Sequence, residues 1–409
     1  AQVDVHHALP FLERHRHGSV ETRDLARAVE ATTGRVLDWF FAQWVEQGAG
    51  HPELAVALSW DPDQRVATVR IEQTQTVDAR TPLFRLPTVV RFRIGDRDHD
   101  VAIEVTDKHQ VLHIALPGEP SQAIFDPGRA LLAHQKVDKA LSLWQAELAH
   151  ATLAADRIAA AHALGIHGGA AATGALMSAL RGDRFWAVRA AAGKALTHGR
   201  IAHARDALIE ALGREAHPRA RRGIVAALGE FRYDPIAADA LRRVVAVGDP
   251  SYFVEAEAAL ALGRTRLADI YPTLEAAAAR ESFTDVIRQH AFRGMAEARL
   301  DQAVDRLLAG LAWGAPSGGR RAAAGALAVL ARGRRDREGR HIRERIEELL
   351  SDGDFRVQTA AIEALAQIGD ADAIPALQRL IDSALDGRLR RRAREVVRDL
   401  GEHAGTSAE

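Results

Sequence analysis

Cysteine is absent from this chain of 409 residues, and lysine is nearly absent. Without cysteine the chain forms no disulfide, offers no thiolate to zinc and has no cysteine nucleophile. Only four of the 54 basic residues are lysines: Lys108, Lys136, Lys139 and Lys194. The rest are arginines, whose planar guanidinium groups bind carboxylates through two hydrogen bonds where they cluster.

Long apolar runs, net charge and aromatic residues are also scarce. No run of about 18 apolar residues occurs, which is the length that a membrane-spanning helix needs. A formal net charge of −1 gives no field that attracts nucleic acid or an acidic membrane, and an aromatic content of 5% offers few platforms for stacked bases. We therefore expect neither nucleic acid nor a membrane as a partner. The compartment stays open between cytoplasm and periplasm.

The last two thirds of the chain carry a repeated helical pattern. A triplet of small or branched apolar residues at positions i, i+4 and i+8 recurs every 32 to 35 residues. The triplets are Val188/Ala192/Leu196, Ala220/Ile224/Leu228, Val254/Ala258/Leu262, Ile287/Ala291/Met295, Ala322/Ala326/Leu330, Val357/Ala361/Leu365 and Leu389/Ala393/Val397, with a weaker copy at Asp156/Ala160/Leu164. Such a period is typical of a helical solenoid, in which each helix pair buries its apolar face on the next.

A residue that can accept backbone hydrogen bonds stands five positions before most of these triplets. These residues are Asp183, Glu215, Asp249, Ser282, Ser317 and Asp352, with Ala384 as the exception. We expect them to cap the second helix of each pair. The triplets and the capping acids together resemble HEAT repeats.

Between residues 51 and 127 the apolar pattern changes to a period of two. Leu54, Val56, Leu58 and Trp60 share one strand face, and similar runs follow at Val90/Phe92/Ile94, Val101/Ile103/Val105 and Leu112/Ile114/Leu116. Short alternating runs separated by turn residues indicate a small antiparallel β-sandwich. We expect the chain to pass to helices at residues 125–132.

The first 50 residues are predicted to be helical. One helix spans 22–32, with Leu25, Ala28 and Val29 facing inward and Gly34 ending it. The next helix gathers Trp39, Phe40, Phe41 and Trp44, and with Val36, Leu37 and Val45 it has almost no polar face. Burying one such side chain contributes roughly 1.5 to 3 kcal/mol, so we expect the four aromatic residues to form a domain interface.

The stretch TTGRVLDWFFAQWVEQGAGHPELAV at 32–56 resembles the end of the catalytic domain in zinc aminopeptidases of the alanyl and puromycin-sensitive type, peptidase family M-one. Residues 11–34 and 123–132 are similar to the neighbouring parts of that family. The resemblance implies a multidomain fold: the last helices of a catalytic domain (1–50), a β-sandwich (51–127) and an α–α superhelix of about eight HEAT-like repeats (128–409). It also implies that the chain is a C-terminal portion, whose partners are the missing N-terminal and catalytic domains and, in the whole enzyme, a peptide substrate.

The zinc site of that family has the motif His-Glu-x-x-His, and none of the 18 histidines begins it. The resemblance therefore implies that zinc lies in the missing catalytic domain, and that this chain has no catalytic residue, metal ligand or cofactor of its own. His6-His7 and His15-x-His17 are interpreted as surface or packing residues, because neighbours at these spacings point to different faces of a helix.

Arginines cluster near the starts of several second helices. We interpret most of them as a solvated face interleaved with acids. The alternative is that Arg219, Arg222, Arg321 and Arg391 line the concave side of the solenoid and receive a peptide's C-terminal carboxylate or another acidic partner.

Two functions are compatible with these patterns. In the first, the chain is the non-catalytic C-terminal region of a zinc aminopeptidase, where it braces the catalytic domain and encloses or selects peptides. In the second, it is a stand-alone HEAT-repeat scaffold that binds protein partners on its concave face.

Overall fold

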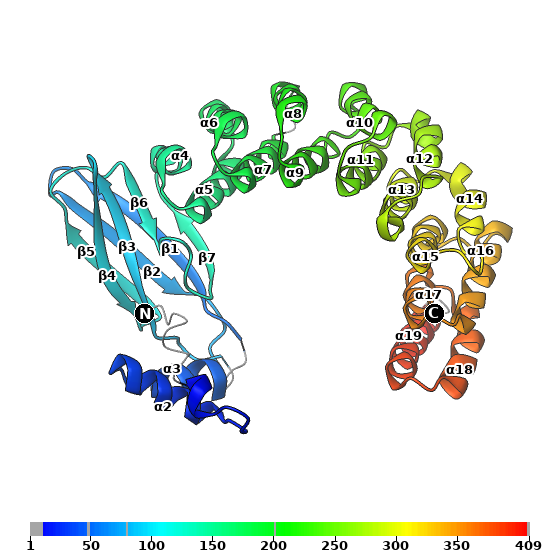
Figure 1. The fold of residues 1–409 in the computed structure, drawn as a ribbon, viewed down its shortest axis with the longest axis horizontal. Helices are drawn as coiled ribbons and strands as arrows, with labels where there is room; N and C mark the ends of the chain where they lie inside the picture. The colour runs from blue at the N-terminus through cyan, green and yellow to red at the C-terminus, as the bar shows by residue number, and fades with distance from the viewer. Residues whose placement is uncertain (1–10, 47–49, 79–80, 200–201, 407–409) are drawn as a thin grey trace. The chain divides into compact units, whose positions relative to one another are not determined.

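The computed structural model describes residues 11–46, 50–78, 81–199 and 202–406. The chain forms two compact units, Ala1–Asp156 and Arg157–Glu409. The first unit contains all the strands of the described residues, and the second is helical (Figure 1). The expected domains 1–50 and 51–127 both lie within the first unit.

The first unit begins with short helices and continues as a sheet structure. Its helical elements with both ends described include α2 (Thr22–Thr33), α3 (Asp38–Phe41), a π-helical turn (Ala42–Glu46) and α4 (Leu141–His150). Its strands are β1 (Glu53–Asp61), β2 (Val66–Gln73), β3 (Leu86–Ile94), β4 (Arg97–Val105), β5 (His109–Ala115), β6 (Gln122–Phe125) and β7 (His134–Asp138).

The strands form a sandwich of two sheets with one apolar core. The four-stranded sheet has the order β5-β2-β1-β7 and the three-stranded sheet the order β4-β3-β6. The predicted alternation is confirmed: Leu54, Val56 and Leu58 of β1 point into the core, where they meet Val90 and Phe92 of β3. Because side chains alternate along a strand, this register leaves the intervening residues to solvent.

The expected passage to helices at residues 125–132 is wrong. Residues His134–Asp138 form β7, which pairs with β1 in parallel, so the sheet extends past residue 127. Val137 is the only aliphatic residue of this edge strand, and a period of two cannot be recognised from a single position. The first helix after the sandwich, α4, begins at Leu141. A buried ion pair joins it to the preceding residues, because Lys139 Nζ lies 2.5 Å from Glu147 Oε1 of α4.

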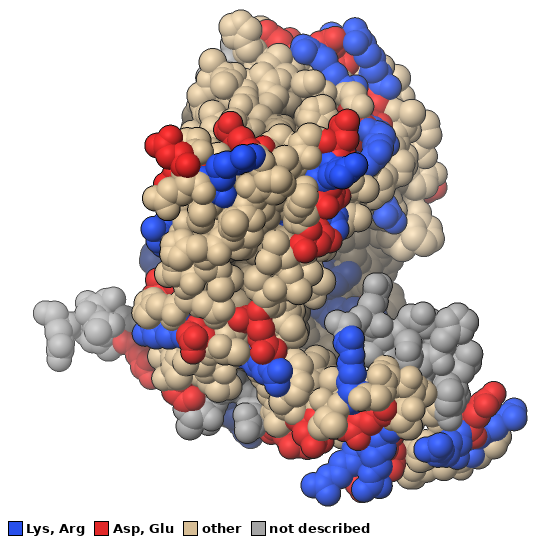
Figure 2. Space-filling view, turned by 90° about the vertical axis from the view of Figure 1, so that its left-hand side faces the viewer, with Lys and Arg blue, Asp and Glu red and all other residues tan. Residues whose placement is uncertain are grey.

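The outer surface of the sandwich carries charges of both signs. Figure 2 shows basic and acidic side chains interspersed on the face that it presents. On β3 and β4, opposite residues pair directly, as in Arg91 with Asp100 at 2.7 Å and Arg93 with Asp98 at 2.8 Å. Such exposed cross-strand pairs each contribute modestly to stability and set the register of the two strands.

The second unit is a solenoid of helix pairs preceded by α5 (Ala154–His167), which begins at the junction of the units. The first helices of the pairs are α6 (Gly169–Gly182), α8 (Ala202–Arg214), α10 (Pro235–Val247), α12 (Tyr271–Ala278), α14 (Val304–Ala309), α16 (Arg337–Glu348) and α18 (Ile374–Ser383). The second helices are α7 (Trp186–Ala195), α9 (Pro218–Leu228), α11 (Tyr252–Arg264), α13 (Val286–Glu297), α15 (Ser317–Ala331), α17 (Phe355–Ile368) and α19 (Gly387–Thr406), and they line the inner side of the arc (Figure 1).

The predicted triplets form the core of the solenoid. From Val188 to Leu365, each of their members is at most 8% exposed. The last triplet is wrong by one residue, because Val396 is buried and Val397 is only half-buried. A step of three or four residues keeps a side chain on the same face of a helix, so the sequence alone did not decide between these two valines.

The expectation that the acids five positions before the triplets cap the second helices is wrong. The N-caps of α7, α9, α11 and α17 lie two residues further on, at Phe185, His217, Ser251 and Asp354.

The acids instead close the turn before the helix and bind an arginine. Asp183 Oδ1 accepts the N–H of Phe185 at 2.8 Å, two residues further on, and so closes the turn within the pair. The same carboxylate accepts two hydrogen bonds from Arg157, which belongs to the preceding helix α5. Arginine and acid recur in this way at Arg189/Glu215, Arg221/Asp249 and Arg320/Asp352. We call these four pairs the arginine–acid ladder.

The ladder is interrupted in the middle of the solenoid. Ser282 and Ser317 occupy the acid positions there, and the hydroxyl of Ser282 accepts the N–H of Ile287 instead. The helices meet at closer range in this region: a Cβ added to Gly263 of α11 would lie 2.1 Å from the carbonyl oxygen of Gly294 on α13. Direct backbone contact between glycines therefore holds α11 against α13 where the ladder is missing.

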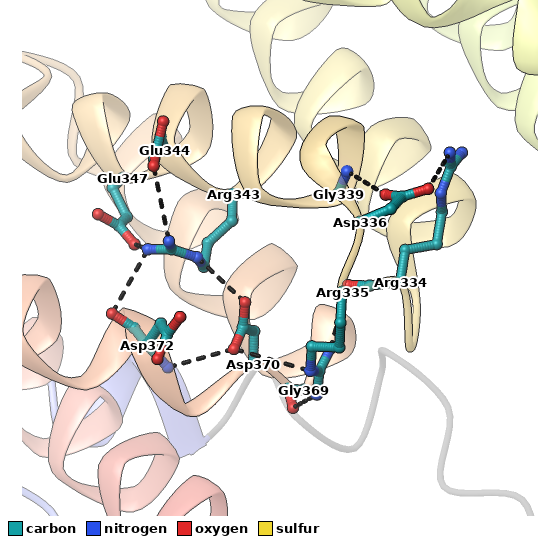
Figure 3. A network of polar contacts seen from close by, with 10 residues as sticks. All are labelled: Arg334, Arg335, Asp336, Gly339, Arg343, Glu344, Glu347, Gly369, Asp370 and Asp372. Carbon is teal, nitrogen blue, oxygen red and sulfur yellow. Dashed lines mark hydrogen bonds and ion pairs between the residues drawn. The ribbon is translucent and has the colours of Figure 1, made fainter.

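A second set of polar contacts connects successive helix pairs near the turn that precedes the first helix of each pair. Figure 3 shows that Arg343 of α16 lies between Glu347 on its own helix and Asp370 at the start of the next pair. Arg335 donates to the carbonyl oxygen of Gly369 at 2.8 Å. The arginine-rich stretch 334–345 is thus interleaved with acids, as expected, although Arg343 is only 8% exposed and is not a solvated residue.

We predict that Arg189→Ala lowers the free energy of unfolding by about 1.5 to 3 kcal/mol, because Glu215 would lose two charge-assisted hydrogen bonds in a mostly buried position. The hydrogen bond from Arg189 lowers the pKa of Glu215 below its ordinary value. The difference between wild type and variant is therefore full at neutral pH and disappears as the pH falls through this lowered pKa. Urea unfolding at several pH values measures it, with Arg243→Ala, an exposed arginine on α10, as the neutral control.

We predict that Gly263→Ala destabilises the solenoid by about 2 to 3 kcal/mol, because the new methyl group overlaps the backbone of Gly294. Gly325→Ala on α15 is the matched control, since a Cβ there meets no atom within 4 Å. The control gains about 0.5 to 1 kcal/mol from higher helix propensity. Equal urea midpoints for the two variants would contradict the close contact.

Candidate functional site

Helix α2 starts and ends as the sequence predicts, but its inward face is different. Asp24 Oδ2 accepts the N–H of Glu21 at 3.0 Å, which caps the start, and Gly34 adopts the left-handed conformation (φ 67) that ends the helix. Ala28 and Val29 are buried as expected. Leu25, expected to face inward, is 39% exposed, and Ala26 takes its place in the core.

The aromatic segment after Gly34 is not the continuous α-helix that we expected. It forms one α-helical turn and then a π-helical turn, Ala42–Glu46. The wider turn places Gln43, 9% exposed, against the sandwich, where its Oε1 accepts the N–H of Arg85 at 2.8 Å and its Nε2 donates to the carbonyl oxygen of the same residue at 3.3 Å. π-helical turns are frequent at functional positions.

The sandwich covers some of the four aromatic residues and leaves another partly bare. Phe41 is 8% exposed, and Trp44 packs on Phe84 with ring centroids 5.2 Å apart. The guanidinium of Arg85 lies 4.6 Å from the Trp39 ring centroid. Phe40 remains 41% exposed. The role of these four residues in a domain interface stays a prediction.

Two further apolar side chains of the same short stretch are exposed. Val36 is 70% exposed and Val45 is 52% exposed. We call Val36, Phe40 and Val45 the front apolar face. The two hydrogen bonds between the Gln43 side chain and the Arg85 backbone, which we call the Gln43 clamp, hold this segment to the sandwich. Exposed apolar side chains on a segment that is bound to a folded domain are typical of an interaction surface.

Two of the four arginines predicted to face a ligand lie on α9 and already have partners. Arg222 Nε donates to Glu257 Oε2 of α11 at 3.1 Å, and its guanidinium lies 6.0 Å from the Phe253 ring. Arg219 lies 5.5 Å from the ring of Trp186, which stacks on His217 at 4.8 Å. Both side chains remain exposed, so they can bind a further group.

Arg321 and Arg391 lie in different places. Arg321 on α15 lines a hollow of about 580 Å³ on the inner side of α11, α13 and α15. Sequence reasoning missed the other arginines of this hollow, Arg264, Arg266, Arg293 and Arg299. The repeat pattern could have identified two of them. Arg264 lies ten residues after the first member of its triplet, and Arg293 lies six residues after the first member of the next triplet. At the periodicity of an α-helix, these positions share a face with Arg321. Arg391 is exposed on α19 and does not line the hollow.

The described residues do not fit a zinc site. No three His, Asp or Glu side chains come close enough together in them to hold a metal ion. His15 packs on the Phe11 ring with centroids 5.0 Å apart, and His17 is exposed. His6 and His7 lie outside the described residues. Within those residues, no helix combines the length and the apolar character needed to cross a membrane.

Comparison with protein families finds the repeats. The sequence profile of HEAT repeats matches residues 173–253 and 304–398. No curated protein matches the sequence.

Comparison with solved structures finds a similar fold in Legionella pneumophila aminopeptidase A, solved in complex with aspartic acid. The two share 13% sequence identity and a TM-score of 0.56, over 96% of this chain and 54% of the aminopeptidase chain. The chain thus spans about half the length of that aminopeptidase, and at this identity the likeness concerns the fold alone.

Two further structures overlap less closely. The CpcE and CpcF complex of phycocyanin lyase from Nostoc has 20% identity and a TM-score of 0.37, over 57% of this chain and 96% of that chain. Human deoxyhypusine hydroxylase has 21% identity and a TM-score of 0.29, over 64% of this chain and 96% of that chain.

We predict that Gln43→Ala releases the aromatic segment from the sandwich, because both backbone groups of Arg85 lose their partner. Limited trypsin digestion should then cut after Arg35 at least about fivefold faster, since local opening exposes the segment before the sandwich unfolds. Gln64→Ala, in the exposed β1–β2 turn, is the control. Unchanged cleavage after Arg35 would show that the clamp does not hold the segment.

Proposed function

We propose that this chain acts as the non-catalytic C-terminal region of a zinc aminopeptidase, bracing the catalytic domain and enclosing or selecting the peptide substrate. Zinc and the residues that bind it would belong to the catalytic domain, because this sequence contains no His-Glu-x-x-His motif. The missing N-terminal and catalytic domains would be its partners.

The front apolar face carries this proposal. Val36, Phe40 and Val45 are exposed on a segment that resembles the end of a catalytic domain, and the Gln43 clamp fixes that segment to the sandwich. A surface with this composition is stabilised when a second folded domain removes it from water. The fold shared with an aminopeptidase over 96% of the chain supports the same interpretation.

The solenoid would supply the enclosing surface. Its second helices form a curved inner wall, and such concave surfaces are where repeat proteins bind extended ligands. Within this proposal Arg219, Arg222, Arg321 and Arg391 are the contacts for a peptide carboxylate or another acidic group. Selection of peptides by charge would follow if these side chains face the enclosed substrate.

The test is to coexpress residues 1–409 with the polypeptide that the same reading frame encodes ahead of residue 1, each part carrying its own tag. We expect the two parts to copurify and to hydrolyse an alanyl anilide in a reaction that a zinc chelator stops. Phe40→Asp should weaken the association at least about tenfold, because it removes roughly 1.5 to 3 kcal/mol of apolar burial and places a charge in the interface.

Val247→Asp is the matched control, since Val247 is 86% exposed on α10 of the solenoid and takes no part in the front apolar face. The proposal fails if the upstream polypeptide has no His-Glu-x-x-His motif, if the two parts do not associate, or if both variants associate as the wild type does.

A further inference from the structure

The hollow on α11, α13 and α15 differs from the rest of the solenoid in its charges. Five arginines line it, Arg264, Arg266, Arg293, Arg299 and Arg321, against one acid, Glu297. In the arginine–acid ladder and in the network of Figure 3, by contrast, arginines are paired with acids. The hollow therefore gathers positive charge in a chain whose formal net charge is −1.

These arginines are weakly engaged within the described residues. Arg264 lies 3.7 Å from Glu257, a carboxylate that Arg222 approaches more closely, at 3.1 Å. Arg321 Nε donates only to the carbonyl oxygen of Ser317 on its own helix, at 3.3 Å. Arg266, Arg293 and Arg299 make no ion pair with a described residue.

Burial is the main cause that lowers the pKa of His290 on α13. The positive charge of Arg293 lowers this pKa further, while the hydrogen bond to Val286 and the charge of Glu257 raise it. The arginines that line the hollow carry like charges and repel one another. This repulsion costs free energy that a bound anionic ligand would recover.

Small residues keep the hollow open. Gly318, Gly325, Ala322 and Ala326 contribute to its lining from α15, and a Cβ added to Gly325 would meet no atom within 4 Å. This is also the region where Ser282 and Ser317 interrupt the ladder. The departure from the repeat pattern therefore coincides with the arginine cluster, as is typical of functional positions.

The number of arginines indicates the charge of the ligand. One carboxylate engages one or two guanidinium groups, which would leave at least three unneutralised. A phosphate group offers three acceptor oxygens and up to two negative charges, and arginine recognises it with two parallel hydrogen bonds. A volume of about 580 Å³ lies within the range of small-molecule sites, roughly 300 to 1,000 Å³.

We propose that this hollow binds a small ligand that carries two or more phosphate groups. Leu260 and Val329 are its only large apolar lining residues among mostly small and charged ones, which favours a compact polyanion over a peptide with apolar side chains. The inference concerns residues of this chain alone and does not rest on the proposed function.

The test is calorimetric titration of the full chain with sodium tripolyphosphate at low salt. We expect one saturable site whose affinity falls as salt is added. Arg293→Gln and Arg321→Gln should each weaken binding at least about tenfold, because each removes a charge-assisted contact. Arg243→Gln, exposed on α10, should change it less than about twofold.

A steric variant keeps the test independent of charge. Gly325→Leu places a side chain in the open space of the hollow and should also weaken binding at least about tenfold, while circular dichroism shows an unchanged helical content. Adenosine triphosphate and inositol hexakisphosphate, titrated in the same way, distinguish a nucleotide from an inositol phosphate as the source of the phosphates.

Three results would overturn the inference. The first is the absence of saturable binding, and the second is an equal loss in Arg293→Gln and Arg243→Gln, which would indicate attraction without a site. The third is tighter binding of citrate or of a Glu-rich hexapeptide with the same arginine dependence, which would assign the hollow to carboxylates. Because association through Phe40 is measured separately, failure here leaves the proposed function untouched.

Discussion

The arginine–acid ladder is the interaction on which the solenoid depends. Each acid closes the turn of its own helix pair and binds an arginine of the preceding pair, so one carboxylate sets both the local turn and the stacking of repeats. The alanine-containing triplets let the helices approach closely, and the ladder joins each pair to the preceding one. In Arg157 and Asp183 both side chains are almost completely buried, so neither is stable there without the other.

Where the ladder is interrupted, a backbone contact between two helices replaces the ion pair. Gly263 and Gly294 let α11 and α13 touch through their backbones, and Arg266, Arg293 and Arg299 make no ion pair with a described residue. They gather instead around the hollow on the inner wall. Close packing of α11 against α13 stabilises this part of the solenoid, so the arginines of the hollow remain available to bind a ligand.

Patterns that repeat could be predicted from the sequence, and contacts between distant residues could not. The triplets and the strand alternation depend on the periods of helix and strand, so Val188 and Leu54 could be placed in a core without knowledge of the fold. The Gln43 clamp joins residues 42 positions apart, and strand β7 is recognisable only by its pairing with β1. The hollow combines side chains from three helices, and a search for clustered arginines in the sequence found only Arg321 of its lining.

The front apolar face is the feature that connects the fold to a function. The clamp and the contact of Trp44 with Phe84 fix one side of the aromatic segment to the sandwich, while Phe40 and its two valine neighbours face solvent. Hydrogen exchange measured by mass spectrometry over residues 35–46 tests this account most directly, on the chain alone and joined to the polypeptide encoded ahead of it. The account predicts at least about tenfold slower exchange in this stretch when the two are joined, because the face becomes buried. Identical exchange in the two states would contradict it.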